Sequence, residues 1–191
     1  MVKQSLKARL ALTVGELAAF TLLLAGLAFG QNWVEERTYF SGGNATPRID
    51  GLLTKPVKGS LGSFVWFQVQ QGYSQAYAGA TYSPQPWVQL ALGGGLEEDK
   101  HPARIGSYVW VGKGRVSGLA VFEDGGSGFW YKVETNCQVT AKLGLGTLTE
   151  AAKGTGPKLE LALPHTPFKL WFAPLWKSGS LTPLVGLRWL L

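Results

Sequence analysis

The chain has 191 residues, of which only 16% are charged, and its formal net charge at pH 7 is +6. Soluble domains usually carry about 25% charged residues, whereas this chain is rich in glycine, with 26 copies, and in aromatic residues, at 12%. Its mean hydropathy of +0.07 is too low for several membrane-spanning helices, and its cations form no basic block that would bind nucleic acid. The single cysteine excludes an intramolecular disulfide. The composition favours strands that are apolar on one face only.

Residues 1–30 have the order of regions found in a secretory signal peptide. Lys3, Lys7 and Arg9 supply positive charge, residues 17–29 form an apolar stretch, and small residues precede Gln31. The apolar stretch is shorter than the roughly 20 residues that a spanning helix needs. We therefore predict export through a cleavable signal peptide, with an uncleaved N-terminal anchor as the alternative.

Residues 31–61 are rich in glycine, proline and threonine. We interpret this segment as a periplasmic lead-in, a plug or a set of accessory strands, and the sequence does not choose among the three.

From residue 62 onward the chain divides into short segments with a period of two, which is typical of strands. Most of the segments are close to the roughly 9–11 residues of a tilted membrane strand. Their connections alternate between short turns and longer polar loops, as in bacterial barrels with short periplasmic turns. The predicted strands are 62–71, 73–82, 86–96, 104–112, 115–123, 128–135, 138–147, 157–164, 168–177 and 181–191.

Successive side chains of a strand point to opposite faces, so parity separates a lipid face from a lumen face. In residues 158–163, Leu159, Leu161 and Leu163 alternate with Lys158 and Glu160. A lysine or arginine on the lipid face costs about 2–4 kcal/mol at mid-depth, so we expect the charges to point inward. The same alternation is found over 86–92, 129–135, 138–145 and 168–176.

Two sets of residues follow from this parity. We interpret the charged set as a structural network in a narrow lumen, with a role in selectivity or substrate binding as the alternative. We expect the aromatic set to lie at the lipid interfaces, where Trp and Tyr are enriched. The lumen set is Lys132, Glu134, Lys142, Lys158, Glu160, Lys169 and Arg188, and the interface set is Tyr82, Trp87, Phe129, Trp176 and Trp189.

The last segment alternates up to the end of the chain, with Val185, Leu187, Trp189 and Leu191 on one face. This segment resembles the C-terminal insertion signal of small bacterial outer-membrane β-barrel proteins, although that pattern usually finishes on Phe or Trp. The resemblance covers residues 62–191 as architecture, together with the signal peptide. It implies insertion into the outer-membrane bilayer by the secretion and barrel-assembly machinery, and it implies no particular activity.

We found no residue pattern that predicts catalysis, a cofactor or a metal site. His101 and His165 both lie in predicted connections, and Glu97, Glu98 and Asp99 share a loop with His101 that is best interpreted as solvated.

The sequence thus predicts an all-β, closed antiparallel up-and-down barrel of about 8–10 strands in the outer membrane. A non-enzymatic role as a narrow channel, a ligand-binding surface or a structural component is favoured, with any small ligand unknown. The alternatives are a barrel enzyme acting on lipid or peptide and a secreted soluble barrel that binds an apolar ligand.

Overall fold

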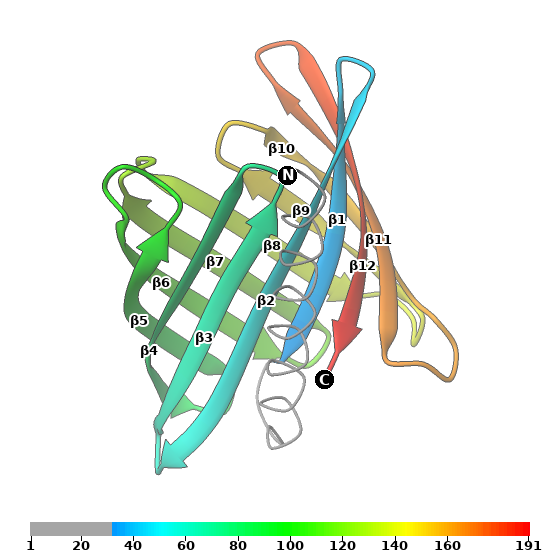
Figure 1. Cartoon of the computed structure of the whole chain (residues 1–191). Coiled ribbons are helices and arrows are strands. Elements are labelled where there is room, and N and C mark those ends of the chain that lie inside the picture. The colour runs from blue at the N-terminus through cyan, green and yellow to red at the C-terminus, as the bar shows by residue number, and fades with distance from the viewer. Residues whose placement is uncertain (1–31) are drawn as a thin grey trace, which may run out of the picture.

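The computed structural model describes residues 32–191, which form one closed barrel of twelve antiparallel strands (Figure 1). Each strand pairs with its neighbours in sequence, and β1 pairs with β12 to close the ring. Within residues 32–191 no helix is long and apolar enough to cross a membrane. The strands are β1 Trp33–Ser41, β2 Asn44–Lys58, β3 Leu61–Gln70, β4 Tyr73–Gln85, β5 Val88–Glu97, β6 Ala103–Lys113, β7 Val116–Gly125, β8 Trp130–Gln138, β9 Leu143–Glu150, β10 Gly154–Ala162, β11 Phe168–Lys177 and β12 Ser180–Leu190.

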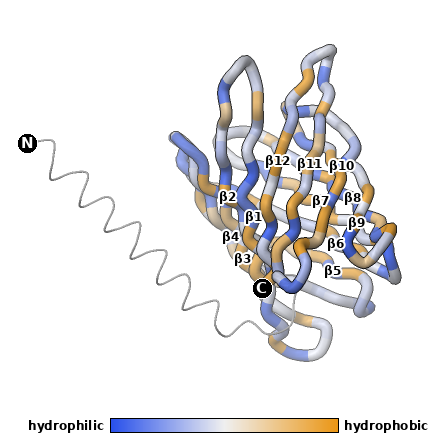
Figure 2. Tube along the Cα trace, turned by 90° about the vertical axis from the view of Figure 1, so that its right-hand side faces the viewer, coloured by the Kyte–Doolittle hydropathy of each residue, from blue (hydrophilic) through white to orange (hydrophobic). Residues whose placement is uncertain are grey.

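The alternation of residue types places the apolar face outward and the charged face inward. In β10, Lys158 and Glu160 are 2% and 4% exposed, whereas Leu159 and Leu161 are 45% and 43% exposed. The alternation is visible along β10, β11 and β12 as changes between polar and apolar colouring (Figure 2). The predicted sidedness is confirmed. A soluble barrel with the apolar face inward is therefore excluded.

The barrel has two more strands than the ten segments found by periodicity. The ten correspond in order to β3–β12, while β1 and β2 lie within residues 31–61 and form part of the wall. The barrel thus begins at Trp33 and not at residue 62, so residues 33–58 are neither a plug nor a separate lead-in. The predicted signal peptide, residues 1–30, lies outside the described residues.

Both ends of the described chain lie at the same end of the barrel. Trp33 is opposite Leu190 in the β1–β12 register, and the Leu191 amide donates to the Asn32 carbonyl at 3.0 Å. We call this the terminal end and the opposite one the distal end. As predicted, the connections alternate between the two ends. They are short at both ends, however, and not longer at one of them. Residues 147–157, which lie between two predicted strands, belong mostly to β9 and β10.

Candidate functional site in the barrel lumen

The lumen contains equal numbers of positive and negative side chains on the inward face of the strands. Most of these side chains are almost fully buried, and Lys169 and Arg188 are half-buried. Such charges need partners, because an unpaired buried charge is costly. The cations are Arg37, Arg48, Arg104, Lys132, Lys158, Lys169 and Arg188, and the carboxylates are Glu35, Asp50, Glu97, Glu123, Glu134, Glu150 and Glu160.

The first network lies towards the terminal end and joins most of the predicted lumen residues. Lys158 Nζ donates to Glu134 Oε1 at 2.6 Å and to Glu160 Oε2 at 3.3 Å. Lys169 Nζ donates to Glu160 Oε1 at 2.7 Å, and Arg188 makes two bonds of 3.0 Å to Glu134. The structure thus brings these five predicted residues together as one connected set.

The other two members of the predicted set lie elsewhere. Lys132 is inside the lumen and fully buried, but it makes no ion pair within residues 32–191. Lys142 lies in the turn between β8 and β9, where its side chain is exposed. Its prediction as a lumen residue was wrong, because the predicted strand 138–147 begins only at Leu143, as β9. Lys142 therefore precedes the strand, and the inward-outward pattern does not extend to it.

A second network lies towards the distal end and involves strands that the sequence analysis missed. Arg37 pairs with Asp50 and donates to Glu150 Oε2 at 3.1 Å. Arg48 pairs with Asp50 at 3.0 Å and with Glu150 at 3.2 Å, and the Tyr39 hydroxyl donates to both oxygens of Glu150. The signal that could have revealed this network is the Arg48–Ile49–Asp50 alternation, which has the same period as the strands that were found.

A third network lies on another part of the distal wall. Arg104 donates to Glu97 Oε2 at 2.7 Å and makes two bonds to Glu123 Oε2, at 2.9 and 3.0 Å. Glu97 also accepts bonds from the backbone and hydroxyl of Ser127. Glu97 is therefore the buried last residue of β5, while Glu98 and Asp99 beyond it are exposed.

An aromatic layer lies between the networks. Trp33 and Trp66 meet edge to face, with their ring centroids 5.6 Å apart, and Lys132 Nζ lies 5.2 and 5.3 Å from the two centroids. These cation–π contacts offset part of the cost of burying the ammonium group. Phe64 contacts Tyr77 and Tyr108, also edge to face, in the same buried cluster.

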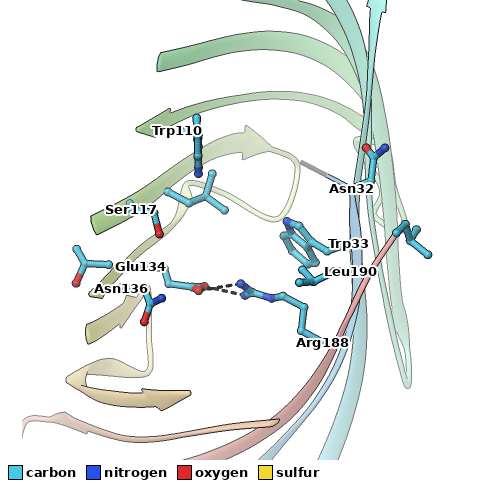
Figure 3. Close-up of a pocket in the computed structure, with 12 residues that line it drawn as sticks. Asn32, Trp33, Trp110, Ser117, Glu134, Asn136, Arg188 and Leu190 are labelled. Atoms are coloured by element: carbon cyan, nitrogen blue, oxygen red, sulfur yellow. Dashed lines mark hydrogen bonds and ion pairs between the residues drawn. The ribbon is translucent and has the colours of Figure 1, made fainter. Parts of the chain in front are cut away.

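Two open cavities of the lumen end at this filled middle. The terminal vestibule, about 340 Å³ in volume, is lined by Trp33, Trp110, Glu134 and Arg188 among others. Arg188 extends across it to Glu134, and the indoles of Trp33 and Trp110 both lie above this pair in the view of Figure 3. The distal vestibule, about 470 Å³ in volume, lies between the second and third networks.

The predicted interface and insertion residues are all exposed, and all of them lie on the outer surface except Phe129 and Leu191, which line the rims of the distal and terminal vestibules. Tyr82, Trp87 and Trp189 are near the terminal end, whereas Phe129 and Trp176 are near the distal end, and each is 41–65% exposed. The remaining members of the C-terminal pattern are also 38–40% exposed; they are Val185, Leu187 and Leu191.

The two histidines lie at opposite ends of the barrel. His101 is in the β5–β6 connection at the distal end, and His165 is in the β10–β11 connection at the terminal end. No group of three His, Cys, Asp or Glu side chains within residues 32–191 is placed to hold a metal ion.

A closed antiparallel barrel with an apolar exterior and a charged interior is the architecture of integral outer-membrane β-barrels. No family model and no curated protein matches this chain. Among solved structures it is similar to a KdgM porin (TM-score 0.57, 13% identity, 83% of this chain and 99% of that chain covered). It is also similar to a NanC porin (TM-score 0.52, 8% identity, 83% and 100% covered). A third similar structure is the Acinetobacter baumannii outer membrane protein Omp33 (TM-score 0.54, 10% identity, 87% and 100% covered).

These similarities establish the porin-type barrel fold, and together with the apolar exterior they support an outer-membrane location.

Proposed function

We propose that this protein is a narrow outer-membrane channel for small polar solutes, with little preference between cations and anions. The observation that supports this proposal is the lumen itself, in which a vestibule opens from each end onto a layer of paired charges and aromatic rings. A purely apolar core would close the barrel without needing fourteen charged side chains.

The size of the barrel supports a narrow passage. Barrels of about eight strands are filled by side chains, whereas those with 16–18 strands leave an aqueous channel. Twelve strands lie between these cases. Here the middle of the lumen is occupied by Trp33, Trp66 and Lys132, whose side chains are almost fully buried. Passage therefore requires these side chains to move aside, which limits both the size and the rate of solute flow.

The charge pattern supports weak ion selectivity. Six of the seven lumen cations contact a carboxylate within 4 Å. One similar structure is a KdgM porin in complex with disordered oligogalacturonate, which is an acidic sugar polymer. The lumen as a whole carries seven cations and seven carboxylates, so we do not extend that ligand to this chain.

Delivery to the membrane completes the proposal. Residues 1–30 act as the signal for export, and the alternating outer face of β12 is the segment that the barrel-assembly machinery recognises. The outward aromatic residues at the two ends then position the barrel at the two lipid interfaces. Carbonate extraction and heat-modifiable gel migration of the chain in a bacterial host test this route.

Planar-bilayer recording tests the channel. We expect small, ohmic conductance steps from the purified protein and a potassium-to-chloride permeability ratio near one. Lys132 and two indoles fill the constriction. Lys132→Ala removes both side-chain volume and an unpaired buried charge from it, so we expect this variant to raise the conductance about twofold or more. Lys142→Ala is the matched control at an exposed turn. The absence of steps from both the native protein and Lys132→Ala would refute the proposal.

A further inference from the structure

The distal vestibule is a polar cavity with aromatic residues in its wall. It is lined by residues of β1–β4 and β6–β9 and of the β7–β8 and β9–β10 turns, among them Tyr39, Tyr73, Phe129 and Trp130. Its volume of about 470 Å³ falls within the roughly 300–1,000 Å³ range of small-molecule sites. Glutamine side chains of β3 and β4 complete its polar lining; these are Gln68, Gln70 and Gln75.

One wall of this cavity carries a lysine that is not neutralised. Arg37 and Arg48 on this side are balanced by Asp50 and Glu150. Lys153, in contrast, makes no ion pair with any residue of the range 32–191, and its Nζ lies 4.9 Å from the centroid of the Tyr39 ring.

The backbone holds Lys153 at the cavity. It lies in the tight β9–β10 turn, where its amide donates to the Glu150 carbonyl at 3.1 Å. The preceding residue, Ala152, has a φ of +67°, a left-handed conformation that is unfavourable for residues other than glycine. This conformation fixes the path of the turn that carries Lys153, as the same conformation at His165 and Ser178 does in two other turns.

Another part of the cavity lining has the opposite imbalance. It contains Glu123 and Arg104, and Arg104 also pairs with Glu97 behind the lining, so these three side chains keep one excess negative charge. Arg104 and Gln75 both donate to Glu123 Oε2, whereas Glu123 Oε1 accepts only the Tyr77 hydroxyl, at 3.1 Å. A carboxylate oxygen can accept two hydrogen bonds, which leaves this oxygen with capacity for a further donor.

We propose that the distal vestibule binds a small zwitterion, an amino acid or short peptide with free ends. Its carboxylate contacts Lys153, and its ammonium group contacts Glu123 elsewhere in the lining. Each part of the lining is then neutralised by the ligand and not by the protein. The Trp130 and Tyr73 rings contact the backbone and side chain between the two ends. The site lies in the lumen of the proposed channel, but its test measures binding without transport, so either proposal can fail alone.

Calorimetric titration of the folded barrel in detergent micelles tests the site with three probes. Diglycine carries both charges, N-acetyldiglycine carries only the carboxylate, and diglycine amide carries only the ammonium group. We expect diglycine to bind roughly tenfold or more tightly than either capped probe, as one extra hydrogen bond to a charged group predicts. Equal binding of diglycine and either capped probe, or no binding of diglycine, would overturn the proposal.

Variants assign the two poles. Lys153→Met should abolish the advantage of diglycine over diglycine amide, while Glu123→Gln should abolish its advantage over N-acetyldiglycine. Lys177→Met is the matched control, because Lys177 is an exposed lysine at the same end but outside the cavity lining. Lys177→Met should leave the preference for diglycine over diglycine amide unchanged. If Lys153→Met also leaves it unchanged, the carboxylate is bound elsewhere and the proposed site is wrong.

Discussion

Replacing Leu159 by lysine moves a cation by one position along β10, from the lumen to the outer surface. Leu159 is 45% exposed and lies between Leu145 of β9 and Phe172 of β11, which are 47% and 43% exposed. These neighbours are apolar and offer no carboxylate. A lysine at mid-depth on the lipid face costs about 2–4 kcal/mol. One position earlier in β10, Lys158 points into the lumen, where it pairs with two glutamates.

The assay is reversible unfolding in urea with phospholipid vesicles, followed by tryptophan fluorescence. Leu159→Ala is the control, because it loses apolar contact, worth up to about 2 kcal/mol, without adding charge. We expect Leu159→Lys to lower the free energy of unfolding by a further 2–4 kcal/mol or so. Equal stability of the two variants would mean that this face does not contact hydrocarbon, and the inference of a membrane barrel would fail.

Two further pairs of variants test the packing of the lumen. A Cβ at Gly106 would overlap the Tyr77 ring, whereas one at Gly94 would meet nothing closer than 3.8 Å. Gly106→Ala should therefore lower the free energy of unfolding by about 1–3 kcal/mol, which is measured as a lower melting temperature on heat-modifiable gels. Gly94→Ala should leave that temperature unchanged. Lys158→Met should cost up to about 3–5 kcal/mol because it removes one of the two cations that pair with each of Glu134 and Glu160. Lys132→Met should be neutral or stabilising in urea unfolding because Lys132 makes no ion pair within residues 32–191. A larger loss for Lys132→Met than for Lys158→Met would contradict the assignment of partners.

Most of the wall could be predicted because each face of a barrel strand contacts one of only two environments, the lipid or the lumen. In β8 and β10 every charged residue falls on the lumen face, as does Lys169 of β11, so the sequence alone separates the faces. The partners of each charge could not be predicted in the same way. Lys158 and Glu134 are 24 residues apart, and only the register of the strands between them brings them together.

The first two strands were missed for local reasons. β1 carries Glu36 on its outer face, between Ile49 and Leu187, so its apolar side is interrupted. β2 contains Pro47 within the sheet, and a proline inside a run argues against a central strand because it cannot donate to the ladder. The second network depends on these strands, and it was therefore missed as well.

The pairing of β1 with β12 has a consequence for biogenesis. The seam of the cylinder joins the first and last strands of residues 32–191, and Arg188 spans it to contact Glu35 at 2.6 Å. Until the final strand is synthesised and docked, every intermediate has two unpaired margins that could recruit another polypeptide. Loss of the eleven residues of β12 would therefore leave an open sheet with two unpaired margins, which favours aggregation.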